Sequence, residues 1–168
     1  MKTLLAAVAL LSATVVSPLV GQEDDETSRQ SLAGLSGVYV LVEHIEDQAQ
    51  RDGLLQDQIQ TDVELKLRQA GITVLTQVQS FSRTGALLYV SVSALKNSSG
   101  FYAYNLDLEL RQQVRLIRNP GVTVLATTWS ATGRIGTVGS TRLSSLRDTV
   151  RDLTDQFINA YLAANPKR

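Results

Sequence analysis

The segment from Phe101 to Ile117 constrains the fold most, because apolar and polar side chains alternate along nearly its whole length. Successive side chains of a β-strand point to opposite faces, so the alternation predicts a long strand with one buried and one solvated face. The apolar positions are Tyr102, Tyr104, Leu106, Leu108, Leu110, Val114 and Leu116, with Gln112 as the polar exception. The opposite positions are Asn105, Asp107, Glu109, Arg111, Gln113 and Arg115. We therefore expect a sheet that is covered on one side only.

Parity also places the two strands that flank this segment. Residues 86–95 have a strand pattern, and a loop over residues 96–100 gives the pairs Ala94 with Tyr102, Val92 with Tyr104 and Val90 with Leu106. On the other side, Asn119-Pro120-Gly121 predicts a tight turn. This hairpin directs Leu125 and Trp129 to the covered face, with Trp129 opposite Gln112. The side chains that it directs to the open face are Val122, Val124, Ala126 and Thr128.

The open face therefore holds a candidate interaction surface. It combines three apolar side chains with two cations of the long strand: Val122, Val124, Ala126, Arg111 and Arg115. So apolar a patch is unusual on a surface exposed only to water, and we expect a partner to cover it.

The remaining elements complete the fold. Residues 38–45 are apolar on both faces and predict a central strand, and residues 72–77 predict a short one. Asp52 is placed to cap a helix that ends at Gly71, with an apolar face of Leu55, Ile59, Val63, Leu67 and Ala70. A final helix ends at Asn165-Pro166 and has an apolar stripe of Leu143, Leu146, Val150, Leu153, Phe157, Ala160 and Ala164. The order β-α-β-β-β-β-α predicts a two-layer α+β sandwich, an antiparallel-rich sheet of about five strands with two helices on one face.

The N-terminus predicts export. Lys2 precedes an uncharged run from Leu4 to Val16, and Gly21 offers a small residue for cleavage, so residues 1–21 fit a signal peptide. The run is short for a membrane span, which leaves an uncleaved anchor as the alternative. Residues 22–34 predict a disordered acidic spacer, and residues 35–166 a single domain. We expect a periplasmic or extracellular protein with no membrane span after cleavage.

Composition excludes several classes of protein. The chain has 16 basic and 16 acidic residues, a balance that argues against nucleic acid as a partner. It has no cysteine, so disulfides, thiolate metal sites and a lipoprotein anchor are excluded. The absence of disulfides and the excess of arginine over lysine favour a bacterial source. We expect no cofactor.

His44 is the only histidine and stands among Glu43, Glu46 and Asp47. Alternation sends Glu43 and His44 to opposite faces, and a zinc site needs more ligands than one imidazole supplies. The chain also has no Gly-x-Ser-x-Gly nucleophile motif. The sequence therefore predicts neither a catalytic nor a metal site, and an enzyme dependent on His44 is the third of three functional hypotheses.

The segment from Gly133 to Arg142 is a candidate anion site. It is expected to be a loop that leads into the final helix, where backbone amides and the helix N-terminus would hold an anion. The residues that would contact the anion are Arg134, Arg142, Gly136 and Gly139. A flexible connection that lets the chain turn over the sheet explains these glycines equally well.

The order of elements resembles that of small periplasmic α/β modules of bacterial envelope accessory proteins. Examples are the N-terminal domain of the Tol-system propeller protein, the activators of penicillin-binding proteins and the periplasmic part of the curli secretion channel. The features that carry the resemblance are the strand Val38 to Ile45, the helix running to Leu67-Arg68-Gln69-Ala70-Gly71 with Ile72-Thr73-Val74 after it, the strand Tyr102 to Leu110 and the strand end Thr127-Thr128-Trp129. The resemblance implies a non-catalytic module that works through protein contacts, although the lipidation cysteine of several such families is missing here.

Three hypotheses follow in order. The first is a non-catalytic, exported interaction module of the bacterial envelope, with an envelope protein as partner and self-association left open. The second is a small anion-binding or ligand-binding domain that uses the Gly133–Gly139 segment. The third is the His44-dependent enzyme.

Overall fold

The computed structural model describes residues 25–131 and 133–166. Its elements are α1 (Glu26–Gln30), β1 (Gly37–Val42), α2 (Asp47–Arg51), α3 (Gln56–Gln69), α4 (Gln77–Ser80), β2 (Gly85–Lys96), β3 (Phe101–Leu116), β4 (Asn119–Ser130), β5 (Arg134–Gly139), the 3-10 helix η1 (Ser140–Ser145) and α5 (Leu146–Ala164). The strands form one sheet in the order β1-β2-β3-β4, and β5 pairs with the first part of β3. The predicted α+β sandwich is confirmed, with several short helices in addition to the two long ones.

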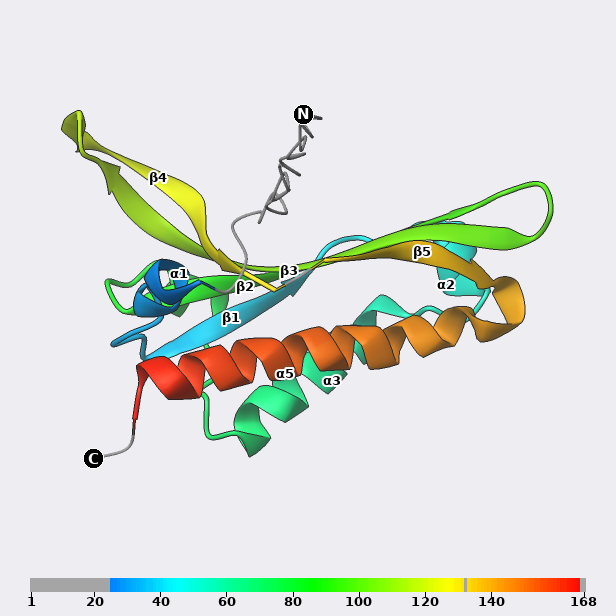
Figure 1. The fold of residues 1–168 in the computed structure, drawn as a ribbon, viewed down its shortest axis with the longest axis horizontal. Coiled ribbons are helices and arrows are strands. Elements are labelled where there is room, and N and C mark those ends of the chain that lie inside the picture. The colour runs from blue at the N-terminus through cyan, green and yellow to red at the C-terminus, as the bar shows by residue number, and fades with distance from the viewer. Residues whose placement is uncertain (1–24, 132, 167–168) are drawn as a thin grey trace, which may run out of the picture.

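Helices α3 and α5 lie on one face of the sheet (Figure 1). The α3 crossover joins β1 to β2, which are parallel, while every other strand pair is antiparallel. The covered face supplies fully buried side chains from each central strand, among them Leu88, Leu106, Leu108, Leu110 and Trp129. The alternation in β3 therefore marks the core as predicted.

The β2–β3 hairpin keeps the predicted faces but not the predicted register. Lys96 pairs with Tyr102, and Ala94 pairs with Tyr104, a shift of two residues. The loop is shorter than expected because Asn97 closes it: its Oδ1 accepts from the backbone N–H of Phe101 at 3.0 Å, and Gly100 takes a left-handed φ of 81°. An even shift leaves every side chain on its predicted face.

The β3–β4 hairpin contains two register shifts, one near the turn between Arg115 and Leu116 and one at Thr128, and together they overturn part of the prediction. Trp129 pairs with Leu110 and Thr127 pairs with Arg111, so Thr128 is an extra residue on β4. Trp129 points inward as predicted, opposite Leu110 rather than Gln112. Between the two shifts the parity is reversed, and Leu125 lies on the open face opposite Gln113. The distal part of this hairpin bends away from the helices (Figure 1).

Strand β1 is at the edge of the strand order, not at its centre. Its outer side is partly covered by residues 73–75, since the N–H of Val38 donates to Thr73 O and the N–H of Leu75 donates to Val38 O. The predicted strand over residues 72–77 is reduced to one bridge between Val38 and Val74. The chain turns instead into α4, which a capping box between Thr76 and Gln79 begins.

Asp52 does not cap the α3 helix, which begins only at Gln56. Its Oδ2 accepts from Lys96 Nζ at 2.6 Å and from Tyr102 Oη at 2.8 Å. The ammonium of Lys96 and the phenol of Tyr102 hold the pKa of Asp52 below its usual value. This carboxylate therefore ties α2 to the β2–β3 hairpin.

The predicted acidic spacer is wrong for the residues that the structure describes. Asp25 caps α1, accepting from the N–H of Ser28 at 2.6 Å, and Leu32 is completely buried. Ser31 O accepts a hydrogen bond from Gln112 Nε2 at 3.0 Å. The one polar residue on the apolar face of β3 thus has one of its two partners in the segment predicted to be disordered, and it also donates to Thr128 Oγ1 at 2.7 Å. The predicted signal peptide, residues 1–21, lies outside the described residues.

Candidate interaction surface

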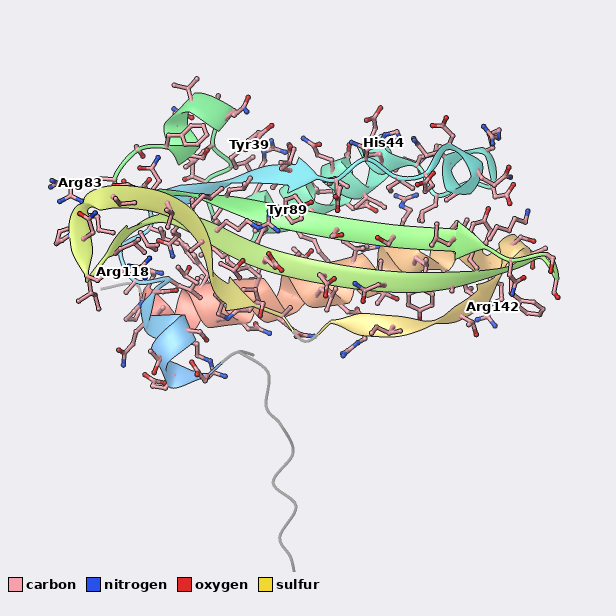
Figure 2. The ribbon with its side chains drawn as sticks, turned by 90° about the horizontal axis from the view of Figure 1, so that it is seen from above. Tyr39, His44, Arg83, Tyr89, Arg118 and Arg142 are labelled. Atoms are coloured by element: carbon pink, nitrogen blue, oxygen red, sulfur yellow. The ribbon has the colours of Figure 1, made fainter. Side chains whose placement is uncertain are left out.

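The face of the sheet opposite α3 and α5 carries the candidate site. Figure 2 looks onto this face, with Tyr39 and Tyr89 on neighbouring strands. One row across it runs from Tyr39 through Leu87 and Arg111 to Thr127. The row therefore combines apolar, cationic and hydroxyl side chains on one surface.

An apolar hollow of about 60 Å³ lies at one end of this face. Its lining comes from β1, β2, β4 and the α4 segment: Tyr39, Leu41, Gln77, Ser80, Phe81, Leu87 and Leu125. Phe81 and Leu125 are 57% and 49% exposed, which is high for large apolar side chains that share a pocket. α4 can form the wall because β2 starts with a glycine: a Cβ at Gly85 would lie 2.3 Å from Gln79 O.

A second, polar hollow of about 340 Å³ adjoins the first. It lies between the loop before β2 and the distal β3–β4 hairpin, and its lining residues are Ser82, Arg83, Gly85, Gln112, Gln113, Arg115 and Thr123. None of them is acidic. The sequence explains this, because no Asp or Glu occurs between Glu64 and Asp107 or between Glu109 and Asp148. Within the described part of the chain, neither Arg83 nor Arg115 forms an ion pair.

A charge network occupies the middle of the open face. Arg111 donates from Nε to Glu109 Oε2 at 2.9 Å, and its guanidinium lies 3.7 Å from the centroid of the Tyr89 ring. Hydrogen bonds from Ser91 and Tyr89, with a smaller effect of Arg111, lower the pKa of Glu43. Burial, followed by the hydrogen bond to Glu43, raises the pKa of Tyr89. Arg111 is therefore held by internal partners, unlike Arg115.

The predicted interaction surface is not one surface. Because of the register shift between Arg115 and Leu116, Val124 pairs with Val114 and Ala126 with Gln112, both on the face that the helices cover. Val122 follows the same alternation as Val124. Arg111 and Arg115 lie on the opposite face with Leu125. The prediction that placed Val122, Val124 and Ala126 on the open face is wrong, and the apolar residues that gather there are those of the apolar hollow.

The predicted anion loop is also wrong in its structure. Residues 134–139 are strand β5, and none of Gly133, Gly136 and Gly139 has a positive φ. Gly136 instead makes room for the ring of Tyr104, whose Oη would lie 2.7 Å from an added Cβ. Arg142 lines a shallow hollow beside η1 and α5, but Arg134 is not part of its lining. The two arginines therefore do not converge on a site.

His44 is exposed, and its Nε2 lies 3.7 Å from Asp47 Oδ1. In residues 25–131 and 133–166, no three His, Asp or Glu side chains come close enough to hold a metal ion. Within those same ranges, no helix combines the length and apolar character needed to cross a bilayer.

The fold and this surface define a class: a two-layer α+β sandwich with one sheet face left open. Comparison with known protein families, with curated proteins and with solved structures found no match. The open face was predictable from the alternation in β3, but the hollows on it were not. They depend on the two register shifts of the β3–β4 hairpin and on α4, and the apolar residues Val78 and Phe81 do not by themselves predict a helix there.

Proposed function

We propose that this chain is a non-catalytic interaction module of the bacterial envelope, exported by its N-terminal segment, which binds a protein partner on the open face of its sheet. The observation that carries the proposal is the apolar hollow, where Leu41, Phe81 and Leu125 are each more than a third exposed on an uncovered sheet face. Apolar side chains gathered in this way on a surface are typical of protein contacts.

The size of the hollow supports a contact with a side chain rather than a cofactor. At about 60 Å³ it is well below the several hundred Å³ that pockets for small molecules occupy. Glu43, Tyr89 and Arg111 on the same face interact with one another, and none of the three lines the hollow. The hollow is therefore suited to binding an apolar side chain of a protein partner.

Export is supported by the sequence of residues 1–21, and it can be tested directly. We expect the protein recovered from cells of its source to begin near Gln22 and to lie outside the cytoplasmic fraction. Intact mass measurement of the purified protein and cell fractionation give the two readouts. A chain that keeps its first residues in the cytoplasm would overturn this part of the proposal.

Site-specific photo-crosslinking tests the open face. A photoreactive phenylalanine derivative at Leu125 or Phe81 should give one discrete adduct with a partner protein in living cells. The matched control is Ile135, which is 85% exposed on β5 but outside the hollow, and should give none. Equal adducts at all three positions, or none at Leu125 and Phe81, would refute the proposed docking face.

Neither alternative gains a supporting observation. Residues 134–139 form a strand, and Arg134 and Arg142 do not converge on one hollow. His44 is exposed, with Asp47 Oδ1 at 3.7 Å from its Nε2.

A further inference from the structure

We propose that the partner presents an extended acidic segment with one large apolar side chain, which enters the apolar hollow while flanking carboxylates pair with Arg83 and Arg115. This inference rests on the proposed function and specifies the chemistry of the partner.

The two hollows adjoin, so one segment can occupy both. Phe81 lines the apolar hollow, and the next residue, Ser82, lines the polar one. Likewise Leu125 belongs to the first, and its register partner Gln113 belongs to the second. Neighbouring residues of an extended peptide lie about 3.3 Å apart, which suits an apolar anchor followed closely by charged residues.

The charges of the polar hollow select an anion. Arg83 and Arg115 are exposed and have no carboxylate partner within the part of the chain that the structure describes. Arg118 is labelled at the same end of the sheet as Arg83 in Figure 2, which makes this end of the molecule richer in cations. A guanidinium binds a carboxylate through two parallel hydrogen bonds, so this end of the face is complementary to Asp and Glu side chains.

The same charges disfavour two other occupants. A second copy of the chain, docked face to face, would bring a hollow that also contains Arg83 and Arg115, while Glu43 and Glu109 are already hydrogen-bonded within their own sheet. A nucleic acid would meet Glu43, Asp107 and Glu109 along the rest of the face, and a polyanion is repelled by them. An acidic peptide with an apolar anchor matches both hollows.

The test measures the binding of synthetic peptides to the chain without residues 1–21. The probe is a capped, fluorescently labelled peptide of Gly and Ser with a central Phe flanked on each side by two Asp. Two companion peptides replace the Asp residues by Lys, or the Phe by Ala. We expect the Asp–Phe peptide to bind, each companion to bind at least about tenfold more weakly, and added salt to weaken binding.

Variants of the protein locate the contact. Arg83→Gln combined with Arg115→Gln should weaken binding of the Asp–Phe peptide by about tenfold or more, because charge-assisted hydrogen bonds are lost. The control removes two exposed arginines elsewhere, Arg142→Gln with Arg151→Gln, and should leave the affinity unchanged. These substitutions are on exposed side chains, so circular dichroism should show unchanged folding for both proteins.

Three results would overturn the inference. They are equal binding of the Lys peptide, an unchanged affinity in the Arg83 and Arg115 double variant, and binding of phosphatidylglycerol vesicles without binding of the Asp–Phe peptide. If any of them occurs while Leu125 still crosslinks to a protein partner, the proposed docking face stands and only the acidic chemistry of the partner is wrong. If the crosslinks fail as well, both proposals fail.

Discussion

At Gly136, the missing Cβ determines how β5 packs on β3. Gly136 is the register partner of Tyr104, and an added Cβ would lie 2.7 Å from Tyr104 Oη and 2.9 Å from Cζ. A phenol ring is rigid and cannot bend away one atom at a time, so the whole ring would have to move. Gly139, three residues on, has only Phe101 Cε1 at 4.0 Å from the same position, an ordinary contact.

Gly136→Ala should therefore lower the free energy of unfolding by about 1–3 kcal/mol, the usual cost of overpacking. Gly139→Ala is the matched control and should change it by no more than about 0.5 kcal/mol or stabilise slightly, because alanine restricts the unfolded chain. Urea unfolding of the two variants measures both values. Equal, small effects would show that residues 134–139 behave as the flexible connection predicted from the sequence, and not as a strand.

At the scale of elements, the sequence predicts those whose patterns are long and regular. The alternation in β3 repeats over 16 residues, and the apolar stripes of α3 and α5 repeat over several helical turns. One exception, such as Gln112, therefore does not obscure the pattern. No repeating sequence pattern marks the bulge at Thr128, because it arises where β4 pairs with Leu110 and Arg111 of β3. The parity counted from the turn is first reversed at the register shift between Arg115 and Leu116, which places Leu125 on the open face and not on the predicted covered face. The bulge at Thr128 reverses it again, so Trp129 points inward as predicted.

Helix α5 is held to the sheet by an aromatic contact. Phe157 is completely buried, and its ring meets that of Trp129 edge to face with the centroids 5.4 Å apart. Trp129 is the only tryptophan, so tryptophan fluorescence reports on the surroundings of this one side chain, which include Phe157. The contact between α5 and β4 can therefore be followed through the fluorescence of Trp129.

Phe157→Ala should cost about 3–5 kcal/mol of unfolding free energy, since it removes the ring and leaves a cavity against Trp129. The emission of Trp129 should also move to longer wavelength as water reaches the site. Leu162→Ala on the same helix, where the side chain is 38% exposed, should cost less than about 1 kcal/mol and leave the emission unchanged. Two variants with equal losses would mean that α5 does not depend on the Phe157 contact.

For the molecule as a whole, the two ends of the described chain hold one another. The N–H of Gly34 donates to Asn165 Oδ1 at 2.8 Å, and Asn165 Nδ2 donates to Leu32 O at 2.9 Å. Tyr161 Oη donates to Leu35 O at 2.8 Å. Composition predicts a solvated spacer here because it averages the acidic residues together with Leu32 and Leu35, which are buried.

This closure makes residues 25–34 part of the cooperative unit, and truncation tests it. A chain that begins at Asp25 should unfold at the same urea concentration as the longer chain, whereas one that begins at Leu35 should lose at least about 2–5 kcal/mol, because it lacks Leu32 and leaves Gln112 without Ser31 O. Leu32→Ala in the chain that begins at Asp25 isolates the apolar part of this loss. Its cost should lie within the same range, and it can be measured even if the chain that begins at Leu35 fails to fold.

Asp25 caps α1 and Glu26 begins it, and both side chains are exposed, so their charge does not require them to be unstructured. One carboxylate can cap a short helix while a leucine that follows the helix is buried. Equal stability of the chains that begin at Asp25 and at Leu35, with no effect of Leu32→Ala, would return this segment to the spacer that its composition predicts.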